Sequence, residues 1–205
     1  DPLAEYLPKF ANALVLQADA KTADDTVPVQ RPITMRHLLS HSAGLSYGFI
    51  EPMSVIDRCY VARGINALGN PDDTLESMCD RLAGAPLVFQ PGTQWRYSLA
   101  TDVTARVVEV LSGQRFDAFL KRRIFDPLGM HDTDFFVPAE KHERFTAMYA
   151  PLDPFSPMKG GLALADDPVK GQYAQPRAML SGGGGLVSTV ADYLAFVRML
   201  VNAGQ

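Results

Sequence analysis

The stretch from Gln90 to Asp132 constrains the fold most strongly, because it holds a Pro-Gly turn followed by two consecutive amphipathic helices. Ser98 is predicted to cap the first helix and Gly113 to end it. Its apolar face is formed by Leu99, Val103, Val107 and Leu111. The second helix is predicted to end at Asp126, with an apolar face of Phe116, Phe119, Leu120 and Ile124. The stretch therefore predicts a helical hairpin with Tyr97 at its mouth.

A series of short motifs follows the order of a known superfamily. The chain reads ITMRHLLSHSAGL, then PGT-x-W-x-YS, a helix, SGQ, a helix and IFDPLGM. This order resembles the serine β-lactamase, penicillin-binding protein and carboxylesterase superfamily, and is most similar to class C β-lactamases and family VIII esterases. Tyr97 matches the tyrosine that lies beside the nucleophilic serine in that superfamily. Class C enzymes continue Tyr-x-Asn, whereas this chain continues with Ser98 and Leu99, as esterases do.

The resemblance implies a mainly α fold, the all-helical domain of the serine β-lactamase/DD-peptidase fold. Long loops and few short strands would lead to an α/β domain that is mostly absent. Residues 1–205 would then be the central portion of a longer enzyme. We expect the N-terminal Ser-x-x-Lys helix upstream of Asp1 and the C-terminal strand motif after Gln205. Without them, the 205-residue chain alone is expected to be inactive.

The resemblance also implies a mechanism and three site residues. Tyr97 would be the general base and acid, with the superfamily's lysine, in acyl-enzyme formation. Ser98 and Leu99 would contact the substrate, and no metal or organic cofactor would be needed. Tyrosine hydroxyls ordinarily titrate near pH 10, so a tyrosine base needs positive charge nearby. The residues alone leave a plainer alternative, in which Tyr97 is half buried against Trp95.

Two further serines match nucleophile motifs by letter. Ser46 lies in G-x-S-x-G, with Asp117 and His131 following in the order of an α/β-hydrolase triad. The residues before Ser46 are helix-like, however, so the strand-turn-helix context of a nucleophile elbow is missing. Ser156 and Lys159 match Ser-x-x-Lys, but the surrounding prolines and glycines favour an irregular loop and a coincidental match.

Other patterns favour structural roles. His37 and His41 share a predicted helical face, but no third metal ligand accompanies them, so local hydrogen bonds of His41 and Ser42 that order the turn are favoured over a metal site. Cys59 and Cys79 are predicted to be free, buried thiols. The glycine run at 181–185 is not followed by Gly-Lys-Ser/Thr, which argues against a phosphate loop.

The remaining segments predict further helices and one long loop. Thr34 is expected to cap a helix that runs to Gly44, and two more helices are expected over 53–69 and 73–84. Asp73 and Glu76 have the spacing of a capping box. After the hairpin we predict a strand over 145–149, a loop over 150–178, and a capped helix with Val190, Leu194, Val197 and Val201 on one face.

The overall composition excludes several classes of function. The net charge is −4, and the basic residues are scattered, so no nucleic-acid partner is indicated. No apolar run reaches the length of a membrane span. The predicted partners are a small-molecule ester or lactam substrate and the missing N- and C-terminal portions of the same protein.

The combined interpretation is a serine carboxylesterase acting on short-chain esters, because Leu99 stands where a β-lactamase has asparagine. One alternative is a class C-type β-lactamase or D-amino-peptide hydrolase, which would turn over nitrocefin much faster than p-nitrophenyl butyrate. A second is an α/β-hydrolase that uses Ser46. A third is a non-catalytic helical binding module, whose partner binding would be insensitive to Tyr97→Phe.

Overall fold

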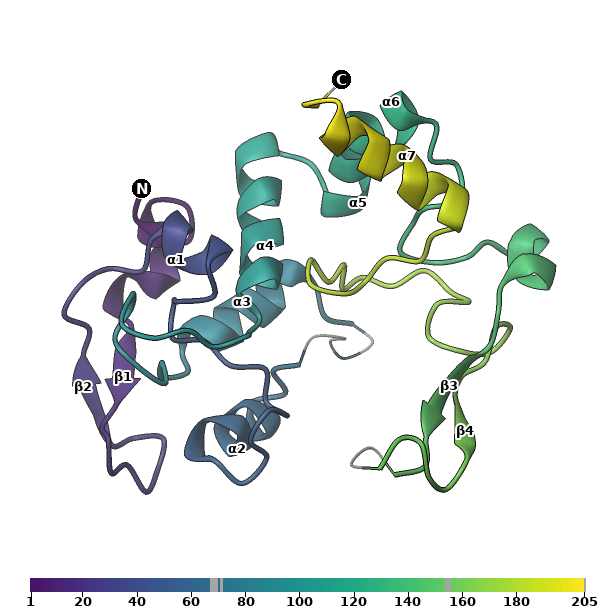
Figure 1. Ribbon diagram of the computed structural model, residues 1–205. Coiled ribbons are helices and arrows are strands. Elements are labelled where there is room, and N and C mark those ends of the chain that lie inside the picture. Colours follow the sequence, from purple (N-terminus) through teal and green to yellow (C-terminus); the bar gives the residue numbers. More distant parts are fainter. Residues whose placement is uncertain (67–69, 71, 154–155, 205) are drawn as a thin grey trace. The chain divides into compact units, whose positions relative to one another are not determined.

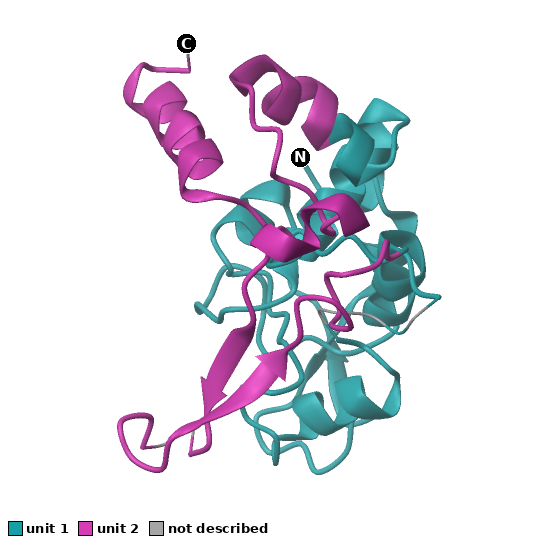
Figure 2. Ribbon diagram, turned by 90° about the vertical axis from the view of Figure 1, so that its right-hand side faces the viewer, with its two compact units in different colours: residues 1–119, 178–185 teal, residues 120–177, 186–205 magenta. Residues whose placement is uncertain are grey.

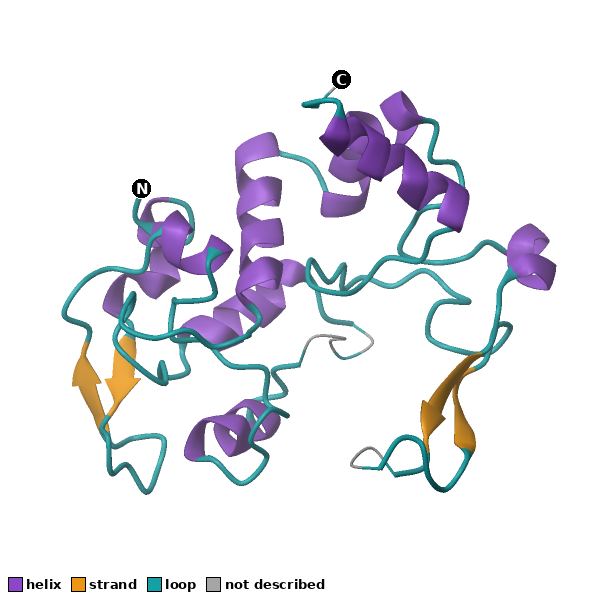
Figure 3. Cartoon of the chain, viewed as in Figure 1, coloured by secondary structure: helices purple, strands orange, loops and turns teal. Residues whose placement is uncertain are grey.

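The computed structural model describes residues 1–66, 70, 72–153 and 156–204. The chain divides into two compact units, which Figure 2 shows in different colours. Unit 1 comprises residues 1–119 and 178–185, and unit 2 comprises residues 120–177 and 186–205. The fold is mostly helical with a few short strands, as the resemblance implied (Figure 3).

Unit 1 begins with short elements and is completed by longer helices (Figure 1). Its elements are the 3-10 helices η1 (Leu3–Glu5) and η2 (Pro8–Asn12), the strands β1 (Leu14–Leu16) and β2 (Thr26–Pro28), and the helices α1 (Met35–Leu39), α2 (Val55–Ala62), α3 (Leu75–Ala83) and α4 (Ala100–Ser112). The strands pair antiparallel, with Val15 opposite Val27. Val15 also forms a parallel bridge with Leu87.

The core of unit 1 forms around α4, which packs against α1 and α3. The predicted apolar face of α4 is only partly buried, because Val103 and Val107 are covered whereas Leu111 is exposed. Gly113 ends the helix with φ 66°, in the left-handed region that favours glycine, as predicted. The largest fully buried side chains of this core include Leu3, Leu38, Leu45, Ile56, Tyr60, Leu75, Met78, Leu82 and Leu87.

Two predicted helix caps are wrong, because the side chains concerned have other partners. Ser98 makes no cap for α4, whose cap position is Leu99 and carries no side-chain hydrogen bond. The box at α3 is formed by Thr74 and Ser77 rather than by Asp73 and Glu76. Asp73 instead forms an ion pair with Arg81, at 2.6 Å.

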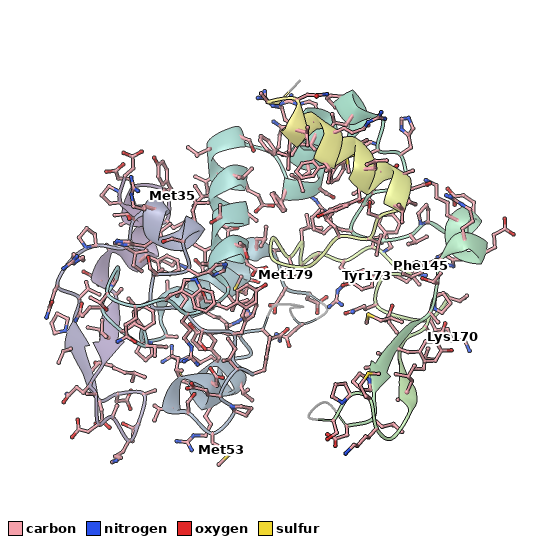
Figure 4. All side chains as sticks on the ribbon, viewed as in Figure 1. Met35, Met53, Phe145, Lys170, Tyr173 and Met179 are labelled. Carbon is pink, nitrogen blue, oxygen red and sulfur yellow. The ribbon has the colours of Figure 1, made fainter. Side chains whose placement is uncertain are left out.

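Two helices in unit 1 are shorter than predicted. Thr34 caps α1 as expected, but the helix ends at Leu39 rather than continuing to Gly44. His41 takes φ 52°, a conformation that turns the chain away from the helix. The helix predicted over 53–69 spans Val55–Ala62, while residues 67–69 lie outside the described residues. The preceding loop carries Met53, which is 80% exposed (Figure 4).

Residues 178–185 return to unit 1 late in the sequence, and we call them the glycine strap. The strap places the buried Met179 (labelled in Figure 4), Leu180 and Ser181 before its glycines. A Cβ added at Gly182 would lie 2.5 Å from the Thr101 carbonyl oxygen and 2.8 Å from the Ala105 Cβ. The strap therefore runs directly against the surface of α4.

After α4 the chain enters unit 2 through a second helical segment, which differs in detail from its prediction. The second helical segment consists of α5 (Phe116–Leu120), the π-helical turn η3 (Lys121–Phe125) and α6 (Asp126–Leu128). It does not stop at Asp126, because a proline is tolerated in the first turn of α6. Gly129, with φ 68°, ends the segment.

Unit 2 also holds a 3-10 helix, a hairpin and the final helix. These are η4 (Ala139–Arg144), the antiparallel strands β3 (Met148–Pro151) and β4 (Leu162–Asp166), and α7 (Val190–Val201). The strand predicted over 145–149 is therefore shifted toward the C-terminus, and β4 falls inside the predicted loop. Helix α7 begins where predicted, and its cap Thr189 accepts a hydrogen bond from the Asp192 backbone N–H. Its apolar face is largely exposed, with Val190 at 89%.

A buried carboxylate holds the start of α7 to the chain after α6. Asp192 accepts hydrogen bonds from the Asp132 backbone N–H at 2.8 Å and from the Thr133 hydroxyl at 2.9 Å. Asp134 and Val187 form an antiparallel bridge beside it. Among the described residues, no helix is long and apolar enough to cross a membrane.

Candidate active site

Tyr97 lies in the loop that follows the turn at Gly92, just before α4. Its side chain is 47% exposed. Its ring lies 4.9 Å from the ring of His41 and 5.0 Å from the ring of Tyr47, measured between centroids. The predicted contact with Trp95 is replaced by these two rings, since Trp95 itself lies against His41. Tyr97 thus has a supported ring and remains accessible to a substrate.

Tyr47 is the site residue that the sequence analysis missed. Its ring is nearly buried between Tyr97 and Phe49. Burial raises the pKa of the Tyr47 hydroxyl, and the Tyr97 hydroxyl and the Asp102 carboxylate raise it further. Tyr47 therefore stays protonated and available as a hydrogen-bond donor near neutral pH.

The glycine strap lies beside both Tyr47 and the buried carboxylate of Asp102. Asp102 is fully buried in the first turn of α4, and its Oδ1 accepts a hydrogen bond of 2.6 Å from the Ser181 hydroxyl. Burial is the main cause that raises the pKa of Asp102. A Cβ at Gly183 would lie 2.8 Å from the Tyr47 hydroxyl oxygen and 3.2 Å from Asp102 Oδ2. Only a glycine leaves room for both polar groups here.

Ser98 and Leu99 are both buried, so Tyr97 is the accessible member of the predicted trio. The Ser98 hydroxyl lies 3.3 Å from His41 Nδ1, and the Leu99 backbone N–H donates to the Ser46 carbonyl. Burial lowers the pKa of His41, which favours the neutral ring beside Tyr97. The predicted contact of Ser98 and Leu99 with a substrate stays a prediction.

Ser46 lacks the geometry of a nucleophile elbow. Its side chain is fully buried, whereas an elbow projects the serine oxygen from the top of a sheet. The Ser46 hydroxyl donates to Asp57 Oδ1 at 2.7 Å and accepts from Arg96 Nε at 3.1 Å. These partners are a carboxylate and a guanidinium rather than a histidine that could remove the proton. Ser46 is therefore a structural residue in this chain.

The letter match Ser156–Lys159 forms a turn between β3 and β4. The Lys159 backbone N–H donates to the Ser156 carbonyl at 2.8 Å, and no helix places the lysine amine above the hydroxyl. The expectation of a coincidental match is confirmed by this geometry.

His37 and His41, which were expected to share a helical face, are separated by the end of α1. His37 Nδ1 accepts from the Thr34 backbone N–H and completes a capping box, whereas His41 lies past the helix. The local hydrogen bonds predicted for His41 and Ser42 are made by their backbone N–H groups, which donate to the Leu38 and His37 carbonyls, while the His41 ring lies against the distant Ser98 hydroxyl. Within the described ranges, no group of three His, Cys, Asp or Glu side chains could hold a metal ion.

With this geometry in view, comparison with known proteins defines the class. The profile of the Beta-lactamase family matches residues 1–205, so the chain belongs to the beta-lactamase family. Lovastatin esterase of Penicillium rubens is 34% identical over 207 residues, which cover 99% of this chain and 49% of that protein. Esterase EstB of Burkholderia gladioli is 36% identical over 203 residues, which cover 94% and 48%.

A solved structure shares the backbone arrangement. EstCE1, described as a hydrolase with promiscuous acyltransferase activity, superimposes with a TM-score of 0.74 at 28% identity. The match covers 100% of this chain and 52% of that protein. The chain thus spans about half the length of the relatives it matches, and these relatives are esterases and acyltransferases of the beta-lactamase family.

Proposed function

We propose that this chain is the central part of a serine carboxylesterase that works through an acyl-enzyme, with Tyr97 as general base and acid. The observation that carries the proposal is the accessible Tyr97 hydroxyl, supported by the rings of His41 and Tyr47 in a chain that matches the family over its whole length. A serine and a lysine from the remainder of the protein would complete the site.

Each step of the proposed reaction has a defined proton path. The serine oxygen attacks the ester carbonyl while Tyr97 accepts its proton, and Tyr97 then returns that proton to the departing alcohol. Water repeats the sequence and releases the acid. Tyr47 lies where its hydroxyl could stabilise a deprotonated Tyr97 oxygen, because burial keeps Tyr47 protonated. None of these steps calls for a metal or organic cofactor.

Ester substrates are supported by two kinds of observation. Two relatives carry the names lovastatin esterase and Esterase EstB. In addition, Leu99 replaces the asparagine that class C β-lactamases place two residues after the tyrosine, and its side chain is buried. We therefore favour short-chain esters over β-lactams. Transfer of the acyl group to an alcohol in place of water is the second candidate, on the strength of the EstCE1 description.

The test compares Tyr97→Phe with the wild-type enzyme expressed from its complete gene. We expect kcat/KM for p-nitrophenyl butyrate to fall roughly 10²- to 10⁴-fold, the usual worth of an acid–base group. Tyr193→Phe is the matched control, since this tyrosine is also exposed but lies on α7. Activity of Tyr97→Phe within twofold of wild type would refute the role, and nitrocefin turnover exceeding ester turnover would favour a β-lactamase.

A fluorophosphonate probe gives an independent test. We expect an adduct on a serine outside these 205 residues in the complete protein, and no labelling or ester turnover by the 205-residue chain alone. An adduct on Ser46 or Ser156 would overturn the mechanism.

A further inference from the structure

The two tyrosines of the site are joined through the residues that precede them. Ser46 precedes Tyr47 in one loop, and Arg96 precedes Tyr97 in another. Arg96 Nε donates a hydrogen bond of 3.1 Å to the Ser46 hydroxyl oxygen, although the two residues are 50 positions apart. A single side-chain contact therefore links the backbones that carry both tyrosines.

A buried carboxylate completes this contact. Asp57, on α2, is fully buried, and its Oδ1 accepts a hydrogen bond of 2.7 Å from the Ser46 hydroxyl and lies 3.8 Å from an Arg96 terminal nitrogen. Its Oδ2 accepts from the Glu51 backbone N–H at 2.6 Å. The Arg96 side chain is only 14% exposed, and its other terminal nitrogen reaches Glu51 Oε2 at 3.3 Å.

Backbone hydrogen bonds also fix the two loops that contain Ser46 and Arg96. The Ser46 backbone N–H donates to the hydroxyl of the buried Tyr60, and the Arg96 backbone N–H donates to the His41 carbonyl at 2.9 Å. The loops before Tyr47 and before Tyr97 are thus fixed on both sides of the Arg96–Ser46 contact.

A buried ion pair of this kind is a weak source of stability, because desolvation offsets much of the attraction. Its clearer effect is geometric, since a planar guanidinium and a carboxylate accept few arrangements. Tyr97 needs such a geometric constraint on its loop, because its own ring has little support. The ring is half exposed and contacts only His41 and Tyr47 among the described ring pairs. Its position therefore depends on its backbone.

We propose that Arg96, Ser46 and Asp57 form a positioning latch. The latch fixes the relative positions of the Tyr47 and Tyr97 hydroxyls, which proton transfer requires. The proposal rests on the proposed function. These three residues do not touch substrate, and they act by setting where the two phenols lie. Misplacement of a proton-transfer group by about 1 Å can cost on the order of 10²-fold in rate.

The first test is Ser46→Ala in the complete enzyme, because it removes one hydroxyl and leaves both charges in place. We expect kcat to fall roughly ten- to a hundredfold with KM changed less than about threefold, and the pH profile of kcat to shift. Arg96→Lys keeps the charge but loses the forked geometry, so it should give the same pattern. Combined with Ser46→Ala, it should add little further loss.

Arg81→Lys is the matched control. Arg81 pairs with Asp73 at 2.6 Å in the same unit and also donates to the Gly64 carbonyl. We expect this variant to lower stability while kcat and its pH profile stay unchanged. An equal fall of kcat in Arg81→Lys and Ser46→Ala would show general destabilisation and overturn the latch.

A spectroscopic readout separates this proposal from the proposed function. The ¹³Cζ signals of labelled tyrosines can be assigned with Tyr47→Phe and Tyr97→Phe, and they report on each phenol without any turnover. We expect Ser46→Ala to move both signals and Arg81→Lys to move neither. If the wild-type enzyme hydrolyses no ester, the proposed function fails while these signals still decide whether the latch exists. Unmoved signals, or moved signals with kcat within twofold, would overturn the latch.

Discussion

Alanine substitutions at three consecutive glycines of the strap should have graded effects, because each glycine meets a different obstacle. At Gly182 a new Cβ would lie 2.5 Å from a backbone oxygen of α4, which cannot move without the helix. At Gly183 it would lie 2.8 Å from the Tyr47 hydroxyl and 2.9 Å from Thr101 Oγ1, which are side-chain atoms. At Gly184 it would meet nothing within 4 Å.

The magnitudes follow from the cost of overpacking. Forcing an extra methyl group into a close-packed site costs about 1–3 kcal/mol, and occasionally more. We expect Gly182→Ala to cost about 3 kcal/mol or more and Gly183→Ala about 1–3 kcal/mol. Gly184→Ala should be neutral or stabilising by up to about 1 kcal/mol, because alanine restricts the unfolded chain.

Equilibrium urea unfolding, followed by far-UV circular dichroism, measures these differences as shifts in midpoint at constant slope. Gly183→Ala should also reduce ester hydrolysis, because the Tyr47 hydroxyl must move to admit the methyl group. Gly184→Ala serves as the control for both readouts. If Gly184→Ala cost as much free energy as Gly182→Ala, the strap would not pack on α4 as described.

Three further predictions concern unit 1. Burial, with two neighbouring arginine charges, lowers the pKa of His37, so its stabilising contribution is present above about pH 6.5 and is lost as the pH falls. His37→Gln should keep the cap on Thr34 and flatten the dependence of the unfolding midpoint on pH below about 6.5. Thr74→Ala should lower the free energy of unfolding by about 0.5–2 kcal/mol, measured in urea, whereas an exposed threonine outside a cap should change it little. Cys59 and Cys79 are buried, and burial raises the pKa of Cys79. Neither thiol should therefore react with Ellman's reagent until the protein unfolds, and prompt reaction in the native state would contradict their burial.

Local signals in the sequence predicted local structure well. Thr34, Gly113 and Thr189 stand at helix ends where the structure places them, because a cap depends on residues within one turn. The failures arise where a side chain has another partner. The Ser98 hydroxyl lies against His41, 57 positions earlier, and Asp73 pairs with Arg81, eight positions later on α3.

In the candidate site, too, a residue within a local motif could be predicted and its distant partner could not. Tyr97 could be found from a contiguous motif that resembles a known family. Tyr47 could not be found as its partner, because the two rings come from loops 50 positions apart in the sequence and meet only in the folded chain. No periodicity or spacing in the sequence predicts such a contact.

The late return of the glycine strap has a consequence for synthesis of the protein. The strap supplies Ser181 to Asp102, a partner 79 positions earlier, while the intervening residues 120–177 belong to the other unit. On the ribosome, α4 therefore emerges long before the segment that covers its first turn. Until then the Asp102 carboxyl lacks its serine partner, so unit 1 closes only after most of unit 2 has been synthesised. Chaperone dependence and the order of folding should accordingly be set by the arrival of the strap rather than by the hairpin that dominates the sequence.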